Sequence, residues 1–447
     1  MKQRAVATLA GLASRAIHTI IAADIKAIDR LVPQKAVEFL VSNADRVVPR
    51  LASTLDRHLV SRVRAIDSRY LKGALAKTLG GAQTYLSYRI APAVITGVER
   101  HLPEAASSRK ISTIVAGVGK YVPDSVIPTE YIEQWLHLKE RFGLTAGMID
   151  RLTGVRERRY AAQGEASSDM AVRASLKAIG QAGISPEDID TIIFAAASQD
   201  IGEPATANIV QEKLGARNAH VFDTKNACNS FVNALDVMDA FIQTGRSRVG
   251  LVASGEVISR FINWNIDDRQ SLKRFMAGLT LGDGGGAMVL TAANGRDEGR
   301  GIRGGSFLSD GSQWRLATIT VGGNMEQFDP AKAFFASNGS ELDKLASKHI
   351  PATIERLLKR LGWKLDEVDL VISHQYTEHT ITNIATQMDF PLSKCMLTVR
   401  KYGNTASASI PIALADAIDE GRVGPGSRVL LVGGAAGFSA GVVGVVL

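Results

Sequence analysis

Apolar residues follow two different spacings along most of this chain. Some runs are continuously apolar, as at 191–198 (TIIFAAAS), which is typical of a strand buried in a parallel sheet. Other segments repeat an apolar residue every three or four positions, as at 168–184, which predicts a helix that Gly183 ends. Up to residue 293 this pattern predicts strands at 110–122, 191–198, 220–224, 248–256 and 286–292, and helices at 168–184, 208–215 and after residue 228.

A second round of alternating helices and strands begins after residue 294. It predicts helices at 346–363, 380–388 and 406–421, and strands at 368–374, 396–400, 428–437 and 442–447. Two successive α/β rounds of similar length indicate two similar layered halves, 108–293 and 294–447. Active residues of such sheets gather at strand ends, so polar residues that directly follow a strand are candidates for a site.

The first 107 residues have a different texture, with helical spacing and few strand signals. The first 110 residues hold 18 Lys and Arg against 8 Asp and Glu, whereas the other 337 hold 34 against 37, so the basic surplus lies here. Arg4, Arg15 and Lys26 are eleven positions apart and share one helical face. Residues 1–107 are therefore expected to be a basic helical extension. It either packs on the rest of the protein or docks on an anionic surface.

Composition narrows the class of protein. The chain has 447 residues, of which 45% are hydrophobic and 22% charged, as in ordinary globular proteins. Its only cysteines, Cys228 and Cys395, cannot build a disulfide framework or a zinc site, so we expect no metal and a cytoplasmic location, peripheral to a membrane if the basic helices bind lipid. Cys395 is interpreted as a core thiol. Nucleic-acid binding is not expected, because the arginines are dispersed and aromatic residues are few.

Three polar residues follow apolar segments in a pattern that suggests covalent acyl transfer. Cys228 lies between a predicted strand and a predicted helix, where unpaired N–H groups and the helix dipole would favour the nucleophilic thiolate. His374 follows the strand at 368–374, and Asn404 lies in the turn KYGNTASAS. Taken locally, a core thiol explains Cys228 equally well, and the local pattern favours a core histidine at His374 and a turn at Asn404.

The motifs together resemble the β-ketoacyl synthase III branch of the thiolase superfamily. The matching segments are TGVRER (153–158), FDTKNAC (222–228), ASGE (253–256), LTLGDGGGAMVL (279–290), SHQ (373–375), GNTASASIP (403–411) and GGAAGFSAG (433–441). The resemblance implies an αβαβα thiolase-like core preceded by the helical extension. Gly282–Gly286 leads into a strand and not a helix, so we interpret it as a structural turn rather than a phosphate loop.

The resemblance also implies roles for single residues. Cys228 would hold the acyl group as a thioester, and the backbone N–H groups of Cys228 and Ala436 would form the oxyanion hole. His374 and Asn404 would each donate an N–H to the thioester oxygen of the second substrate. The substrates would be acyl-CoA or acyl carrier protein thioesters, with no other cofactor. The product would be a 3-oxoacyl thioester.

Glu203 and Arg151 mark departures from the simple synthases of the family. Glu203 lies in an EPATA motif, like the glutamate of the head-to-head acyl-CoA-condensing thiolases, and would act as a general base across a homodimer interface. The alternative is a carboxylate that merely begins a helix beside Pro204. The family's usual coenzyme A-binding Trp and Arg are Met148 and Leu152 here, and Arg151 would substitute for them. A Cys–His–Asn hydrolase and a non-catalytic partner subunit are the remaining function classes.

Overall fold

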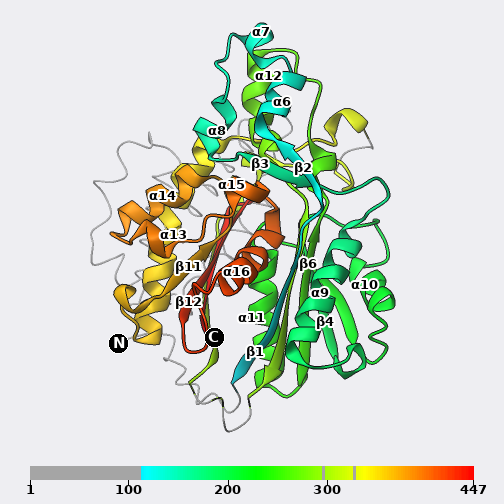
Figure 1. Ribbon diagram of the computed structural model, residues 1–447, viewed down its shortest axis with the longest axis vertical. Helices are drawn as coiled ribbons and strands as arrows, with labels where there is room; N and C mark the ends of the chain where they lie inside the picture. Colours follow the sequence, from blue (N-terminus) through cyan, green and yellow to red (C-terminus); the bar gives the residue numbers. More distant parts are fainter. Residues whose placement is uncertain (1–111, 294–296, 298, 326–328) are drawn as a thin grey trace, which may run out of the picture. The chain divides into compact units, whose positions relative to one another are not determined.

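Two β-sheets with a pair of helices between them form the described part of the chain (Figure 1). The computed structural model describes residues 112–293, 297, 299–325 and 329–447. The expected basic helices of residues 1–107 lie outside the described residues. Within the described ranges, no helix combines the length and the apolar character that a membrane crossing requires.

The first sheet has the strand order β1-β7-β6-β4-β5. β4 is buried along its whole length and pairs in parallel with both β5 and β6, as its continuously apolar sequence predicts. The elements of this half are β1 (Thr113–Tyr121), α9 (Ser167–Ala182), β4 (Thr191–Ala195), α10 (Thr206–Leu214), β5 (His220–Thr224), α11 (Ser230–Gln243), β6 (Val249–Glu256) and β7 (Gly284–Ala292).

The second sheet has the order β11-β12-β13-β8. β11 and β12 are parallel, whereas β13 runs antiparallel to both of its neighbours. The elements of this half are β8 (Gly301–Ser309), α13 (Gly339–Leu361), β11 (Leu370–Ser373), α14 (Glu378–Gln387), α15 (Val399–Tyr402), α16 (Ser409–Asp419), β12 (Arg428–Ala435) and β13 (Ser439–Val446), with a small ribbon of β9 (Ala317–Thr318) and β10 (Ala336–Ser337).

The order of layers is αβαβα, which confirms the expected thiolase-like core. α11 and α16 lie between the sheets, and their apolar residues join both sheets in one core cluster. α9 and α10 cover the outer face of the first sheet, and α13 and α14 cover that of the second (Figure 1). Residues at the ends of α11 and α16 can therefore contact residues of both halves.

Close contact between α9 and the first sheet depends on glycine. A Cβ on Gly119 of β1 would lie 2.1 Å from the carbonyl oxygen of Ala174, and one on Gly285 of β7 would lie 2.2 Å from that of Met170. Both distances are far below van der Waals contact, so only glycine fits at these positions. Gly284 and Gly285 are already part of strand β7. The turn predicted at Gly282–Gly286 is therefore shorter than expected.

A cap covers the ends of the first-sheet strands and has no counterpart among the predicted elements. It consists of the hairpin β2 (Ser125–Pro128) and β3 (Glu157–Tyr160) and the helices α6 (Thr129–Trp135), α7 (Leu138–Phe142), α8 (Met148–Thr153) and α12 (Arg269–Phe275), at the top of Figure 1. These helices are too short to show a clear apolar period. Their apolar residues form a cluster that also includes Leu281, Ala406 and the half-buried Cys228. The cap therefore covers the region around the cysteine.

The strand predicted at 396–400 is wrong. Val399–Tyr402 is the short helix α15, and Cys395 makes only a single bridge with Val371 of β11. The backbone N–H groups of Thr398 and Val399 donate to the side-chain oxygen of Gln375, at 2.9 and 3.0 Å. A side chain thus satisfies the groups that a neighbouring strand would otherwise bind.

Candidate active site

Cys228 occupies a tight turn between β5 and α11. Ala227, just before it, has a left-handed backbone with φ of 47°. The hydroxyl of Ser230 closes the turn, because it accepts from the N–H of Asn226 and donates to the carbonyl of Ala227, both at 2.7 Å. The cysteine side chain lines a cavity of about 740 Å³ directly before the first turn of α11.

Burial of Cys228 opposes the thiolate that a helix start favours. Burial, together with the negative charge of Glu256, raises the pKa of Cys228 to about 12. A helix N-terminus contributes about 0.3–1 kcal/mol, which is less than one pKa unit and too little to offset burial. Burial therefore favours the neutral thiol form of this side chain.

Glu256, at the end of β6, is the buried carboxylate behind the cysteine. Its oxygens accept from the N–H of Ala197 at 2.8 Å and from the N–H and hydroxyl of Ser198 at 3.0 and 2.7 Å, and the N–H of Ser407 donates at 3.2 Å. Burial raises its pKa to about 7 in spite of these donors. Sequence reasoning missed this residue, although it lies within the ASGE motif.

Ser407 extends the same network to the nucleophile. Its hydroxyl accepts from the N–H of Phe231 in the first turn of α11 at 3.0 Å and donates to the carbonyl of Ala195 at 2.9 Å. The loop that follows Asn404 is thereby tied both to β4 and to the helix of Cys228. This loop was predicted only as part of a helix, and its serine gave no local signal of a long-range partner.

His374 directly follows β11, and a serine hydroxyl contacts one nitrogen of its ring. Its backbone N–H donates to Val432 at 2.7 Å, and its Nδ1 lies 2.9 Å from the hydroxyl oxygen of Ser409. Burial lowers the pKa of His374 to about 4, so the imidazole is neutral at pH 7. Because a neutral imidazole carries one proton, only one of its nitrogens can donate.

Asn404 is held in a fixed orientation. Its backbone N–H donates to Thr280 at 2.9 Å, and its carbonyl accepts from Gly282 at 3.0 Å. Its side-chain oxygen accepts from the N–H of Ala406 at 2.9 Å, which leaves the amide nitrogen as the group available to the cavity. The fixed amide supplies an N–H donor that does not titrate.

One cavity brings together residues from distant parts of the chain. Cys228, His374, Asn404 and Ala436 all line it. Away from the cysteine it continues beneath α13 and α14 as an apolar branch, lined by Ile350, Ile354, Ile381, Ile384, Met388 and Phe390. Where side chains of the lining are exposed, they include Trp314, Ile319 and Met325. The volume and apolar lining suit an aliphatic chain better than a polar substrate.

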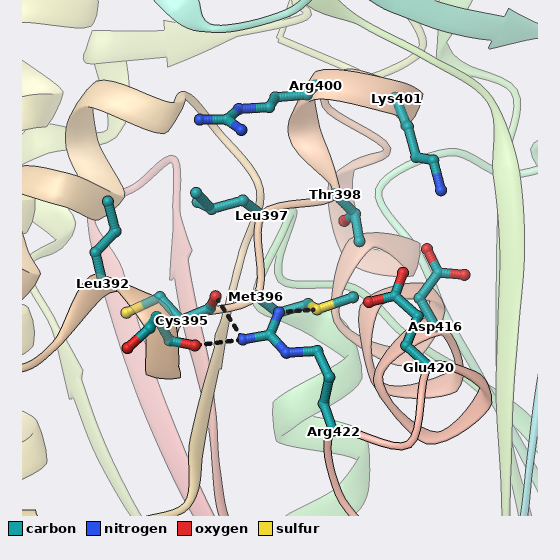
Figure 2. A pocket seen from close by; sticks show the side chains of 11 residues that line it. Leu392, Cys395, Met396, Leu397, Thr398, Arg400, Lys401, Asp416, Glu420 and Arg422 are labelled. Atoms are coloured by element: carbon teal, nitrogen blue, oxygen red, sulfur yellow. Dashed lines mark hydrogen bonds between the residues drawn. The ribbon is translucent and has the colours of Figure 1, made fainter.

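Cys395 lines this cavity and also a smaller hollow of about 380 Å³, which Figure 2 shows. Arg422 lies across the hollow and donates to the carbonyls of Ser393 and Cys395, at 2.6 and 3.2 Å. Burial raises the pKa of Cys395 to about 11, and its side chain packs in the apolar cluster beneath α13. The smaller hollow is not lined by Cys228, His374, Asn404 or Ala436.

Glu203 and Arg151 do not line the cavity of this chain. Glu203 is exposed in the loop before α10. Arg151 lies on α8 and donates to the carbonyl of Ala146 at 2.6 Å and to Thr145. Neither residue therefore contacts the space next to Cys228 within a single chain.

Comparison with known proteins identifies relatives over most of the described chain. Family models match residues 222–311 (3-oxoacyl-[acyl-carrier-protein] synthase III) and residues 358–446 (its C-terminal part). The β-ketoacyl-[acyl-carrier-protein] synthase III of Clostridium perfringens is 35% identical over 327 residues, which cover 72% of this chain and 95% of that protein. The Paramagnetospirillum magneticum protein of the same name is 34% identical over 73% of this chain and 96% of its own length.

Solved structures agree with the family models. The 3-oxoacyl-[acyl-carrier-protein] synthase III of Aquifex aeolicus is 31% identical, with a TM-score of 0.66 over 75% of this chain and 100% of its own. Xanthomonas campestris OleA is 26% identical, with a TM-score of 0.69 over 76% of this chain and 98% of its own. Fold and site together define an acyltransferase of the thiolase type. The chain belongs to the 3-oxoacyl-[acyl-carrier-protein] synthase III family.

Proposed function

We propose that this protein joins two acyl thioesters by Claisen condensation through an acyl-Cys228 intermediate. The observation that supports the proposal is that Cys228, His374, Asn404 and Ala436 line one largely apolar cavity. The family relatives are named for the same class of product, a 3-oxoacyl thioester. The substrates would be acyl-CoA or acyl carrier protein thioesters, with no further cofactor.

The first half-reaction is transfer of an acyl group to Cys228. The sulfur attacks the thioester carbonyl, and the carbon–sulfur bond to the carrier breaks as the carrier thiol leaves. The backbone N–H groups of Cys228 and Ala436 would stabilise the oxyanion that forms at the carbonyl oxygen. Both residues line the cavity, and both belong to turns directly at the end of a strand or before a helix.

The second half-reaction forms the carbon–carbon bond. With a malonyl thioester as second substrate, the carbon–carbon bond to the carboxylate breaks and CO₂ leaves, which generates an enolate. The amide nitrogen of Asn404 would donate to the thioester oxygen and stabilise this enolate, which attacks the acyl-enzyme. His374 lies at the same cavity and would assist at the same oxygen. When the bond forms, Cys228 leaves as a thiolate and takes up one proton, which restores the resting thiol.

The apolar branch beneath α13 and α14 favours a second candidate, the head-to-head condensation of two long-chain acyl-CoAs. A malonyl group has no alkyl chain to place, whereas a second fatty acyl thioester needs an apolar space of this kind. Because no carboxylate would then be lost, a base must remove the α-proton, and Glu203 is the candidate.

Product analysis separates the two reactions. We expect the purified protein, given acyl-CoAs of several chain lengths and malonyl-acyl carrier protein, to form 3-oxoacyl-acyl carrier protein, as detected by mass spectrometry. With acyl-CoA alone, an accumulating 3-oxo acid derivative that carries two long chains would support head-to-head condensation. Absence of both products, with acyl-CoA hydrolysed instead, would contradict the proposal.

We also propose that the protein is a homodimer that places Glu203 at the partner's site. β5 is an edge strand of the first sheet, with a free edge among the described strands. Asp223 of β5 accepts from the N–H groups of Thr206 and Ala207, both at 2.8 Å, which ties the Glu203 loop to this edge. A partner that pairs along β5 would therefore lie next to Glu203.

Mixing inactive subunits tests this arrangement. Glu203→Gln and Cys228→Ala homodimers should each be inactive in head-to-head condensation, while mixed dimers should regain part of the activity. One site of each mixed dimer would then contain both intact residues. If subunit exchange is demonstrated by mass and no activity returns, Glu203 does not act across the interface.

For residues 1–107 we propose a separate basic module that docks on an anionic surface, either a membrane leaflet or an acidic carrier protein. A chain that starts near Ser107 should still acylate Cys228 but lose co-sedimentation with anionic vesicles or affinity for the carrier protein. The full chain's binding should weaken above physiological salt, where the Debye length falls below about 8 Å. An insoluble truncated protein would instead indicate that these residues pack on the catalytic body.

A further inference from the structure

The turn that follows Asn404 has a strained backbone. Ala406 has a left-handed conformation with φ of 43°, which residues other than glycine rarely adopt. The N–H of this same residue donates to the side-chain oxygen of Asn404 at 2.9 Å and so fixes the orientation of the amide. The bonds of Thr280 and Gly282 hold the backbone of Asn404 but not its side chain. The direction of the amide therefore depends on what keeps the Ala406 turn in place.

Ser407, the next residue, holds this turn through three hydrogen bonds. Its N–H donates to a carboxylate oxygen of Glu256 at 3.2 Å, and its hydroxyl donates to the carbonyl of Ala195 at 2.9 Å. The hydroxyl oxygen also accepts, at 3.0 Å, the N–H of Phe231 in the first turn of α11, a donor that has no acceptor within its own helix. These bonds join the turn to β6, to β4 and to the helix of Cys228. A strained backbone persists where its surroundings fix it in this way.

Glu256 supplies the acceptor that this arrangement needs. Its side chain is fully buried, and one carboxylate oxygen accepts from Ala197 and Ser407 while the other accepts from Ser198. The groups around it are three backbone N–H groups and a hydroxyl, so an acceptor is required between them. Without the carboxylate, the N–H groups of Ala197 and Ser407 would lose this partner in a buried place, which is costly enough to displace both loops.

We propose that Glu256 is a positioning residue: its carboxylate fixes the Ala406 turn, and through it the amide of Asn404, in relation to the helix of Cys228. This inference deepens the proposed function and rests on it. Glu256 does not line the cavity, so it acts through other residues. Its effect on condensation passes through Asn404, which would stabilise the enolate of the second half-reaction.

The charge of Glu256 also reaches the nucleophile. Burial and, after it, this negative charge raise the pKa of Cys228. Burial raises the pKa of Glu256 itself to about 7, so most of the carboxyl groups are ionised at pH 8. Because the thiolate is the form that reacts with alkylating agents, an ionised Glu256 should slow the alkylation of Cys228. This effect depends on charge and is separable from the hydrogen bonds.

Hydrogen exchange of the full chain tests the positioning role without any activity. In Glu256→Ala, the peptide that covers residues 403–409 should exchange its amide hydrogens about tenfold faster than in wild type. The reason is that the N–H groups of Ala406 and Ser407 lose the contacts that protect them. Unchanged exchange of this peptide would overturn the inference. Since the measurement needs no substrate, it fails independently of the proposed function.

Asp190→Ala is the matched control for lost stability. The carboxylate of Asp190 accepts from the N–H groups of Arg248 and Val249, at 2.8 and 3.3 Å, where β4 and β6 begin rather than where they end. It does not line the cavity. Its removal takes away comparable bonds but should leave both the exchange of residues 403–409 and the two half-reactions unchanged.

The two half-reactions should respond differently in Glu256→Ala. Condensation should fall about 10²-fold, the usual effect of losing one oxyanion donor, because Asn404 no longer keeps its direction. Acylation should fall less, since it does not use this amide. Wild-type condensation would overturn the positioning role.

Glu256→Gln tests the same role with a milder change. The amide oxygen can still accept from Ala197 and Ser407, and the hydroxyl of Ser198 can turn to accept from the amide nitrogen. Condensation should therefore recover to about tenfold below wild type, with acylation not reduced. If Glu256→Ala does not fold, this variant decides, and wild-type condensation by it would overturn the inference.

Alkylation of Cys228 tests the charge. At pH 8, iodoacetamide should modify Cys228 in Glu256→Gln about tenfold faster than in wild type, because the neutral amide no longer opposes the thiolate. Mass analysis of peptides reads Cys228 and Cys395 separately, and the rate at Cys395 should not change. Asp190→Asn should alkylate at the wild-type rate. Equal rates at Cys228 in Glu256→Gln and wild type would show that the charge of Glu256 does not act on the nucleophile.

Discussion

Cys228→Ala should abolish covalent acylation of the protein by acyl-CoA. The wild-type chain is expected to gain the mass of one acyl group as a thioester, because the sulfur lies in a turn that opens into the apolar cavity. Without the sulfur the thioester cannot form at this position, so both the adduct and the condensed product should disappear. Intact-mass spectrometry after incubation with acyl-CoA measures the effect.

Cys395→Ala is the matched control for this substitution. Cys395 is the second cysteine of the chain, is buried and packs in the apolar cluster beneath α13. The control variant should keep the adduct, with at most a change in preferred chain length because Cys395 lines the cavity's apolar branch. An adduct that persists in Cys228→Ala would show that the nucleophile has been assigned to the wrong residue.

Asn404→Ala should reduce condensation by at least about 10²-fold, the usual effect of losing one oxyanion donor. Its amide is oriented by Ala406 so that the nitrogen is left for the substrate, and the enolate forms only in the second half-reaction. The acyl-enzyme should therefore accumulate. Quenched-flow mass analysis of the protein, combined with product assays, separates the two half-reactions.

Asn383→Ala provides the control for Asn404, since Asn383 is exposed on α14 and bonds only the surface residue His379 among the contacts found. It should leave both half-reactions unchanged. His374→Ala should also lose condensation by about 10²-fold or more. Equal loss of both half-reactions in Asn404→Ala would instead support a hydrolase-like arrangement.

The local spacing of apolar residues was sufficient to predict those elements whose buried face is regular. The continuous apolar run of β4 and the three-to-four spacing of α9 reflect which faces are buried, so both elements were predictable from the sequence. The cap was not, because its helices are too short to show a period and their apolar residues pack against remote segments. The strand predicted at 396–400 was wrong for a related reason, because the side chain of Gln375 replaces a neighbouring strand as hydrogen-bond partner.

Some residues of the candidate site could likewise be predicted from the sequence, and others could not. Cys228, His374, Asn404 and Ala436 could be named from the sequence because each follows an apolar segment within a motif that the family shares. The buried partners behind them could not, since Glu256, Ser407 and Ser409 are ordinary polar residues whose neighbours lie far away in the chain. Nothing in their local spacing indicates a long-range hydrogen bond.

By itself, the sequence determined the alternation of strands and helices, the kinds of reactive group and their positions at strand ends, because burial leaves a periodic record in the chain. Only the tertiary structure decided the chemical state of those groups. Burial disfavours the charged forms of Cys228 and His374, and the fold places the hydroxyl of Ser409 against Nδ1 of the imidazole. Such states depend on the dielectric surroundings and on the direction of each hydrogen bond, and both arise only when distant segments pack together.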